Sequence, residues 1–373
     1  TTSVASMTTH LFSTSAGALY VFIAPQEPLI RSYWIMFKRP RLSAAKRLVN
    51  APSLLALLFL ASACSNPVDT PVTEASEEVV ETPEAPPVSG LSMPAVWNTS
   101  PLSAAPTSVG IAGELGSTIA VSYADGGLQL FNFEAEQITS KADLNVEQVG
   151  DGRFLLLSGT PVTVFPGIDR EGTLQAFIHG GELDEPLAYG FNIDQKGPAA
   201  GLCTAPPQGD IDGVMRLAYW TEDTPTTLHS GRIVQVNESL VFLADEPVEA
   251  DQPINSCLLE ELGATVFSRP TSASIALDRN GKRHRLTLNT FGEVERLLDT
   301  GETEPVRIRD GISVPMPAEP VDLTGTGDAR GGGYPGGLMV VAGETDTGDY
   351  RVILVDPSAL TLAPLGVPVT TVE

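Results

Sequence analysis

The sequence has few of the residue types that mark metal-binding, hydrolytic and nucleic-acid-binding proteins. It holds 4 histidines and 3 cysteines in 373 residues, and 22 basic side chains against 46 acidic ones. His179, His229 and His284 stand alone, without the paired spacing of a zinc site. No Gly-x-Ser-x-Gly segment is present to form the nucleophile turn of a serine hydrolase. The shortage of positive charge argues against a nucleic-acid partner, because phosphate binding needs a basic face.

The excess of acidic residues is concentrated in one part of the chain. Six of the basic residues but only one acidic residue, Glu27, precede Cys64, which leaves 45 acidic and 16 basic side chains from Cys64 onward. No Lys or Arg occurs between Arg47 and Lys141. This part of the protein is therefore expected to attract cations rather than anions.

The N-terminal region has the order of an export signal. Because residue 1 is Thr, we interpret Met36 as the start and residues 1–35 as an upstream extension. After Met36 come five basic residues, an uncharged apolar run at 54–60 and the small triplet at 61–63. This is the three-part layout of a signal peptide, and its apolar run is too short to span a bilayer.

The small residues before Cys64 resemble the lipobox of bacterial lipoproteins, although Ala61 stands where Leu is usual. The resemblance implies that residues 36–63 are removed and that the thiol of Cys64 receives a lipid, which anchors the protein to a membrane. Ser65 after the cysteine indicates the outer membrane or periplasmic side of a Gram-negative envelope. An ordinary secretory peptide cut at Ala63 and an uncleaved anchor remain open.

Residues 64–97 are expected to form a disordered, acidic tether. Between 65 and 94 there are six prolines and six acidic residues. Proline removes backbone donors and like charges repel, so this segment lacks the means to build a core and is expected to space the following domain from the membrane.

Residues 98–373 are predicted to form a single all-β domain. Short β-prone runs alternate with Gly, Pro, Asp and Asn, and almost no segment has a long helical period. A sandwich, a barrel and a propeller all fit this pattern; the length favours a six-bladed β-propeller. The predicted strands are 117–123, 127–133, 153–157, 173–179, 214–220, 232–236, 240–243, 264–268, 273–277, 285–289, 337–341 and 350–355.

Four segments carry a resemblance to a known family. The stretch 320–357 has an Asp-hydrophobic-Thr-Gly element at 322–325, then Gly-rich turns, a Tyr-Pro-x-Gly-Leu strand from Tyr334 and a Gly-Glu turn at 343–344. The segments 200–203, 255–261 and 116–133 agree in order. Together they resemble the β-propeller phytases, and the chain would be a divergent member on a lipoprotein signal.

The resemblance implies a six-bladed propeller that hydrolyses phytate, or another phosphorylated small molecule, with Ca²⁺ clustered at one mouth of its channel. Carboxylates would gather the ions, and the ions would neutralise phosphate and activate water. The candidate metal ligands are Asp322, Glu344, Glu260 and Glu261. Capping of backbone N–H groups is an equal alternative for Asp322 and Glu344. Asp210 and Asp212 lack the other positions of a Ca²⁺ loop.

The chain departs from the family pattern where acids would be expected. Asn255 precedes the second cysteine strand, and Ser268-Arg269 ends the next strand. Both changes remove oxygen ligands, and a cationic Arg269 would repel a metal ion. Two functions therefore compete: a Ca²⁺-dependent phosphomonoesterase of the 3-phytase type with impaired catalysis, and a non-catalytic binding or scaffolding propeller.

Cys203 and Cys257 remain after lipidation of Cys64. Export permits a disulfide between them, but both lie on predicted inner strands, where buried free thiols are equally compatible with the pattern.

Overall fold

The computed structural model describes residues 90–112, 117–205, 215–237, 239–260, 263–279, 281–328 and 333–361. All of them belong to one compact unit, residues 81–373. The predicted signal segment, Cys64 and the tether up to residue 89 lie outside the described residues. The described part contains strands and one 3-10 helix, η2 (Pro357–Thr361), and no α-helix. No helix in it has the length and apolar character needed to cross a membrane.

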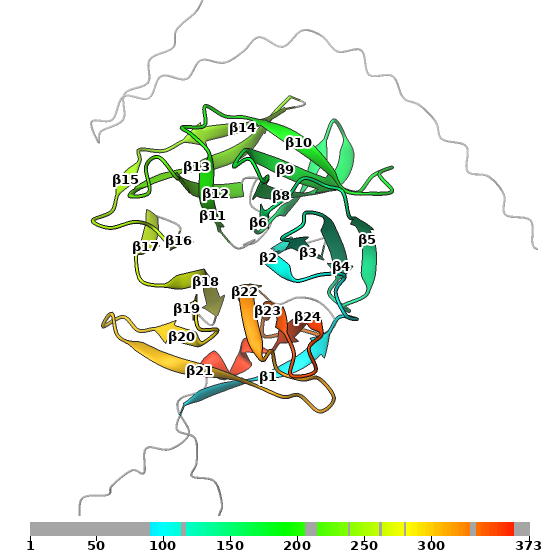
Figure 1. The fold of residues 1–373 in the computed structure, drawn as a ribbon, viewed down its shortest axis with the longest axis vertical. Helices are drawn as coiled ribbons and strands as arrows, with labels where there is room; N and C mark the ends of the chain where they lie inside the picture. The colour runs from blue at the N-terminus through cyan, green and yellow to red at the C-terminus, as the bar shows by residue number, and fades with distance from the viewer. Residues whose placement is uncertain are drawn as a thin grey trace, which may run out of the picture. The chain divides into compact units, whose positions relative to one another are not determined.

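The first strands after β1 form a separate four-stranded antiparallel sheet in chain order. Its members are β2 (Pro106–Ala112), β3 (Thr118–Tyr123), β4 (Leu128–Asn132) and β5 (Gln137–Lys141). β2 and β3 are buried over almost their full length, whereas β5 is largely exposed. The order of burial places β2 at the centre of the domain and β5 at its rim (Figure 1).

The following strands repeat this arrangement twice and are joined at the rim. The first group comprises β6 (Gln148–Val149), β7 (Arg153–Leu157), β8 (Thr160–Ile168), β9 (Leu174–His179) and β10 (Leu187–Asn192). The second comprises β11 (Ala199–Thr204), β12 (Met215–Thr221), β13 (Thr227–Val236), β14 (Ser239–Ala244) and β15 (Val248–Glu249). A short parallel pairing of β10 with β14 links the two groups into one ten-stranded sheet.

A two-stranded sheet comes next, formed by β16 (Ser256–Glu260) and β17 (Gly263–Phe267). It is followed by β18 (Thr271–Arg279), β19 (Lys282–Asn289), β20 (Val294–Leu297) and β21 (Thr303–Arg309). The last group is β22 (Glu319–Thr326), β23 (Leu338–Glu344) and β24 (Tyr350–Val355).

Strand β1 (Leu91–Asn98) joins the two ends of the described chain. It pairs antiparallel with β24 and parallel with β21, so residues from the start of the domain complete the sheet formed by its end. This strand begins at Leu91, inside the segment 64–97 that composition assigned to the tether. The prolines and acids of this segment are typical of a linker, but its end has the period-two burial of a strand. Met93 and Ala95 are fully buried and alternate with less buried neighbours.

Hydrophobic side chains between neighbouring sheets hold the groups together. One core cluster lies between β18–β21 and β22–β24, and another lies between β2–β5 and β22–β24. The β7–β8 hairpin shows how local sequence sets the pairing. Ser158 and Gly159 form its two-residue turn with positive φ values of 52° and 80°, as a type I′ turn requires.

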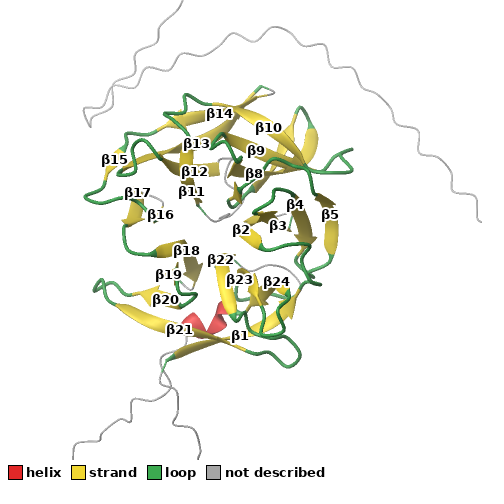
Figure 2. Ribbon diagram, in the orientation of Figure 1, coloured by secondary structure: helices red, strands yellow, loops and turns green. Residues whose placement is uncertain are grey.

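The sheets of this unit surround a common centre, with β2, β6, β11, β16, β18 and β22 innermost (Figure 1). Figure 2 shows that the connections between them are loops and turns. Small antiparallel sheets that start at an axis and end at a rim define a β-propeller. The all-β expectation and the propeller architecture are thus confirmed.

Candidate functional site: the axial cavity

A cavity of about 250 Å³ lies where the innermost strands face one another. Its described lining is mostly polar and contains two carboxyl groups, Asp151 and Asp322, with no Lys, Arg or His. The hydroxyl and amide groups that line it belong to Gln148, Thr204, Asn255, Ser256, Ser272, Ser274 and Thr324. The cavity is therefore a site that supplies hydrogen-bond acceptors and negative charge.

Asp322 lies within β22 rather than in a turn, and its carboxylate accepts backbone N–H groups. The N–H of Val109 in β2 donates to Oδ2 at 2.7 Å, and the N–H of Leu323 donates to Oδ1 at 2.9 Å. Because β2 pairs with β3 on one side only, Asp322 serves as the partner of its open edge. The side chain thus joins the last sheet of the propeller to the first.

Asp151 likewise accepts a backbone N–H group from the open edge of β2, two residues beyond Val109. The N–H of Ile111 donates to Asp151 Oδ1 at 2.9 Å, and the hydroxyl of Thr324 donates to the same atom. The N–H of Asp151 in turn donates to Thr204 Oγ1 at 2.6 Å. Sequence reasoning missed Asp151, although the Gly150-Asp151-Gly152 segment that carries it signals a close backbone approach.

Glycine makes this approach possible. A Cβ on Gly110 would overlap the carbonyl oxygen of Gly150, so the two backbones can lie this close only without side chains. Gly152 donates its N–H to Ile111 O at 2.8 Å, which continues the contact between the two inner segments. The glycines therefore set the geometry that brings Asp151 to β2.

Both carboxyl groups are harder to ionise than usual. Burial raises the pKa of Asp322 to about 8, against the opposing effect of the N–H groups of Val109 and Leu323, and the charge of Asp151 raises it further. Burial raises the pKa of Asp151 to about 6, and its hydrogen bonds from Thr324, Ile111 and Thr204 act in the opposite direction. At neutral pH Asp322 is thus mostly protonated.

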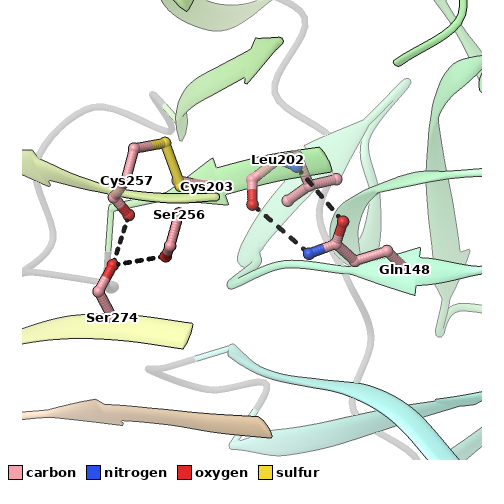
Figure 3. Close-up of a disulfide and its surroundings, with 6 residues drawn as sticks. All are labelled: Gln148, Leu202, Cys203, Ser256, Cys257 and Ser274. Carbon is pink, nitrogen blue, oxygen red and sulfur yellow. Dashed lines mark hydrogen bonds between the residues drawn. A yellow bond between two sulfur atoms is a disulfide. The ribbon is translucent and has the colours of Figure 1, made fainter. Parts of the chain in front are cut away.

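Further side chains connect the remaining inner strands, as Figure 3 shows. The amide of Gln148 in β6 both donates to and accepts from the backbone of Leu202 in β11, at 3.5 and 3.3 Å. Cys203 in β11 and Cys257 in β16 form a disulfide with a Cα–Cα distance of 5.7 Å. The hydroxyl of Ser274 in β18 donates to the carbonyl of Cys257 at 2.7 Å.

The predicted metal ligands do not come together among the described residues. The carboxylate of Glu260 accepts a 2.6 Å contact from Arg285 Nε, and Glu344 is hydrogen-bonded to Tyr350 at the far end of β23. Glu261, Asp210 and Asp212 lie outside the described residues. Within the described ranges no three His, Cys, Asp or Glu side chains are placed to share a metal ion.

The residues that are present do not fit a Ca²⁺ site. A calcium ion takes 6–8 oxygen ligands, several of them ionised carboxylates. Both oxygens of Asp322 accept backbone N–H groups, and Glu260 is paired with a guanidinium. Asn255, where the family pattern has an acid, donates its amide to the carbonyls of Ser268 and Arg269 at 2.9 and 3.2 Å.

A second hollow of about 490 Å³ adjoins the cavity through Gln148 and Ala200, which line both. It lies at the start of the inner strands and is lined by three acids, Glu147, Glu171 and Glu222, and by one base, Arg170. This second hollow and the cavity thus both carry an excess of acidic groups in their described lining.

The fold and the cavity define a β-propeller with a polar axial site, and sequence comparison adds nothing to this description. No protein-family model and no curated protein sequence matches the chain. AofleA from Arthrobotrys oligospora is 11% identical with a TM-score of 0.43, covering 66% of this chain and 81% of that one. Sqt1 from Saccharomyces cerevisiae is 10% identical with a TM-score of 0.37, covering 71% and 100%.

BBS1N, solved in complex with ARL6DN, is 11% identical with a TM-score of 0.35 and covers 64% of this chain and 74% of that chain. At these identities and scores the likenesses carry no conclusion about this chain. Its propeller architecture rests on its own strand pairing.

Proposed function

We propose that this chain is a lipid-anchored, six-bladed propeller that binds a ligand and does not hydrolyse phosphate esters. The observation that carries the proposal is the use of Asp151 and Asp322, whose carboxyl groups join inner strands by accepting backbone N–H groups. Carboxyl oxygens engaged in this way are not free to gather the cations that phosphate-ester hydrolysis of this type needs.

The inner strands support a count of six blades. Each of β2, β6, β11, β16, β18 and β22 begins a run of strands that proceeds outward in chain order. Five of these runs have at least four strands when β1 is counted with β22–β24, and the run from β16 has two. This arrangement supports six blades, one of them reduced.

The lining of the cavity supports a small polar ligand that is neutral or positively charged. Hydroxyl, amide and carboxyl groups converge there. The phosphates of phytate would be repelled by the negative charge of Asp151 and of the acids that line the second hollow. A volume of about 250 Å³ is near the lower end of small-molecule sites.

The N-terminal motif supports attachment of this propeller to a membrane through Cys64, at the outer membrane or in the periplasm of a Gram-negative cell. The acidic segment after Cys64 would hold the domain away from the lipid surface. β1 begins at Leu91, so the spacer in this arrangement ends before that residue.

The experiment that tests the loss of catalysis is phosphate release from phytate by the purified chain, with Ca²⁺ and with chelator. We expect no release above the buffer rate in either condition. Chelator-sensitive turnover that Glu344→Gln abolishes would refute the proposal and restore the phosphomonoesterase hypothesis.

Binding in the cavity can be followed through Trp220, which lines it. In a chain that starts at Cys64, and so lacks Trp34, a Trp97→Phe background removes the signal of the other tryptophan, which is exposed and not part of the lining. Titration with glucose and with ethanolamine tests a neutral and a cationic probe. A saturable change in Trp220 emission that Ser274→Val weakens supports the site, and unchanged emission with both probes counts against it.

A further inference from the structure

Four large apolar side chains gather, exposed to water, at one end of the strands β1, β20 and β21. They are Trp97, Phe291, Ile312 and Met316, and we call them the apolar rim patch. Phe291 and Ile312 are the two most exposed large apolar side chains in the described part of the chain. Single exposed apolar side chains are common on protein surfaces, whereas a group of them indicates a surface that meets a partner.

The strand register brings the patch residues to the same end. β1 and β21 run parallel, and their last pair is Pro94 with Arg309. Trp97 and Ile312 each follow that pair by three residues. β20 runs antiparallel to β21, so the β19–β20 turn that carries Phe291 lies where β21 ends. Figure 1 shows the three strands side by side at the rim of the propeller.

The loop between β21 and β22 connects the two parts of the patch. Near its start the loop lies against β1, since a Cβ on Gly311 would lie 2.1 Å from the carbonyl oxygen of Ala95. Near its end, Met316 lines a hollow of about 390 Å³ together with Gly292, which follows Phe291 in the β19–β20 turn. The loop therefore runs from the part of the patch on β1 to the part on that turn.

The turn that carries Phe291 has polar counterparts elsewhere in the propeller. The Asn289 side chain accepts the N–H of Phe291 at 2.9 Å, which fixes the turn. In the β4–β5 turn Asn132 accepts the N–H of Glu134 in the same way, at 3.0 Å. The β8–β9 turn repeats the arrangement, again with a glutamate at this place. The turn itself therefore does not require an aromatic side chain, and Phe291 is explained by what it meets outside the turn.

The segment that carries Ile312 is also held by its own hydrogen bonds. The N–H of Gly311 donates to the carbonyl of Val314 at 2.8 Å, and the N–H of Met316 donates to the carboxylate of Asp310 at 2.8 Å. Side chains that are presented by ordered turns lose less conformational entropy on binding than side chains of a mobile loop. The patch is thus organised for contact before a partner arrives.

The character of the patch fits a lipid surface. Side chains at the tips of turns protrude, and a bilayer accepts them without a complementary pocket. Trp97 adds a ring of the type that gathers at the level of the lipid headgroups. Arg307 and Arg309 are exposed on β21 next to the patch, where they can meet lipid phosphates, in a chain whose net charge is −24.

We propose that the apolar rim patch inserts reversibly into the lipid surface to which the chain is attached. The tethered domain then has two states, one free above the bilayer and one docked on it through the patch. This inference rests on the proposed attachment at Cys64. Leu91, the first residue of β1, follows Cys64 by 27 residues, a segment that spans at most about 90 Å even when fully extended. Attachment thus keeps the patch near lipid in every molecule.

The test uses the chain from Cys64 onward, which contains all the described residues. Cys203 and Cys257 are joined in a disulfide, so the thiol of Cys64 can be coupled chemically to a maleimide lipid in phosphatidylcholine vesicles. This coupling makes the result independent of whether a cell lipidates Cys64. A failure of docking is then distinct from a failure of the proposed anchor.

The readout is quenching of tryptophan by lipids that carry bromine on their acyl chains. This chain has two tryptophans: Trp220 is buried beside the axial cavity, and Trp97 is exposed in the patch. The Trp97 signal is the difference in emission between the wild type and Trp97→Phe. We expect brominated vesicles to lower this signal by about twofold or more relative to ordinary vesicles, because docking places the ring at the lipid.

A double variant tests the patch while the reporter Trp97 stays in place. Phe291→Ser combined with Ile312→Ser should lower the ratio of docked to free domain at least about tenfold, so that brominated lipid no longer quenches Trp97. Both positions are exposed, so the variant should fold. The matched control is Leu156→Ser combined with Leu243→Ser, which removes exposed apolar side chains from β7 and β14 and should be quenched like the wild type.

Equal emission of Trp97 in brominated and ordinary vesicles would overturn the proposal. Equal quenching of the wild type and of the variant at Phe291 and Ile312 would also overturn it, since coupling alone would then bring Trp97 to lipid. The same holds if the control variant loses its quenching. Sedimentation of the uncoupled chain separates lipid from a protein partner: a monomer supports the proposal, and a dimer that the patch variant breaks would assign the patch to a second copy of this chain.

Discussion

The buried carboxyl of Asp322 should make the stability of the propeller depend on pH in a specific direction. Its pKa is about 8 in the folded protein, against an ordinary value of 3.8 for the carboxyl in the unfolded chain. Between these values the folded state holds a proton that the unfolded state has lost. The stabilisation is therefore complete below pH 3.8 and is lost as pH rises through 8.

The informative window is pH 6 to 8, because Asp151 also titrates below about pH 6. Two pH units at 1.36 kcal/mol each correspond to about 3 kcal/mol from Asp322. Because Asp322 is already about half ionised at pH 8, we expect a measured loss of roughly 2 kcal/mol across this window. The sign is the opposite of that for a salt-bridged carboxylate.

Asp322→Asn removes the titration and keeps the shape. In acid the variant should be less stable than the wild type by about 1–3 kcal/mol, because the amide nitrogen cannot accept one of the two N–H groups. The difference should shrink as pH rises to 8 and above. The measurement is urea unfolding of both proteins at pH 5, 6, 7, 8 and 9, followed by circular dichroism.

The difference between the two curves isolates Asp322, since both proteins share every other titrating group. Asp346→Asn, in the exposed turn after β23, is the control and should follow the wild type at each pH. A constant difference between wild type and Asp322→Asn from pH 5 to 9 would refute a protonated, buried Asp322.

Three further outcomes are expected. Replacing Cys203 and Cys257 by Ser should lower the free energy of unfolding by about 4 kcal/mol, since the disulfide closes a loop of 54 residues, and urea unfolding of the double variant against the oxidised, disulfide-bonded wild type checks this. A chain that starts at Thr99 lacks β1, which bridges β21 and β24, so it should unfold at lower temperature and less cooperatively in calorimetry than a chain that starts at Gly90; equal transitions would contradict the closure by β1. Cys64→Ala should abolish labelling by a radioactive fatty acid, and equal labelling of wild type and variant would exclude the lipid anchor.

Some strands could be predicted from local sequence because their pairing is local. Residues 153–157 and 350–355 were expected as strands and form β7 and β24 with the same bounds. In both, short apolar runs are followed or preceded by turn residues, as in the Ser158-Gly159 turn. β1 escaped prediction because its partners are more than 200 residues away in the chain and its own composition is that of a linker.

The candidate site was predictable only in part. Asp322 was identified from its motif, but a motif does not show that both of its oxygens meet backbone N–H groups. Asp151 was not identified, because its partners in β2, β11 and β22 are 40, 53 and 173 residues away. Glu260 was identified as an acid, whereas its pairing with Arg285 depends on the packing of two sheets.

The sequence by itself determined the properties that depend on composition and on neighbours in the chain. The acid excess, the signal-like order before Cys64 and the alternation of short β-prone runs with turn residues belong to this class. Tertiary structure alone decided which polar groups became partners. A carboxyl group ionises, binds a metal ion or caps a backbone donor according to what surrounds it, and in a propeller those surroundings come from sheets that are distant in the chain.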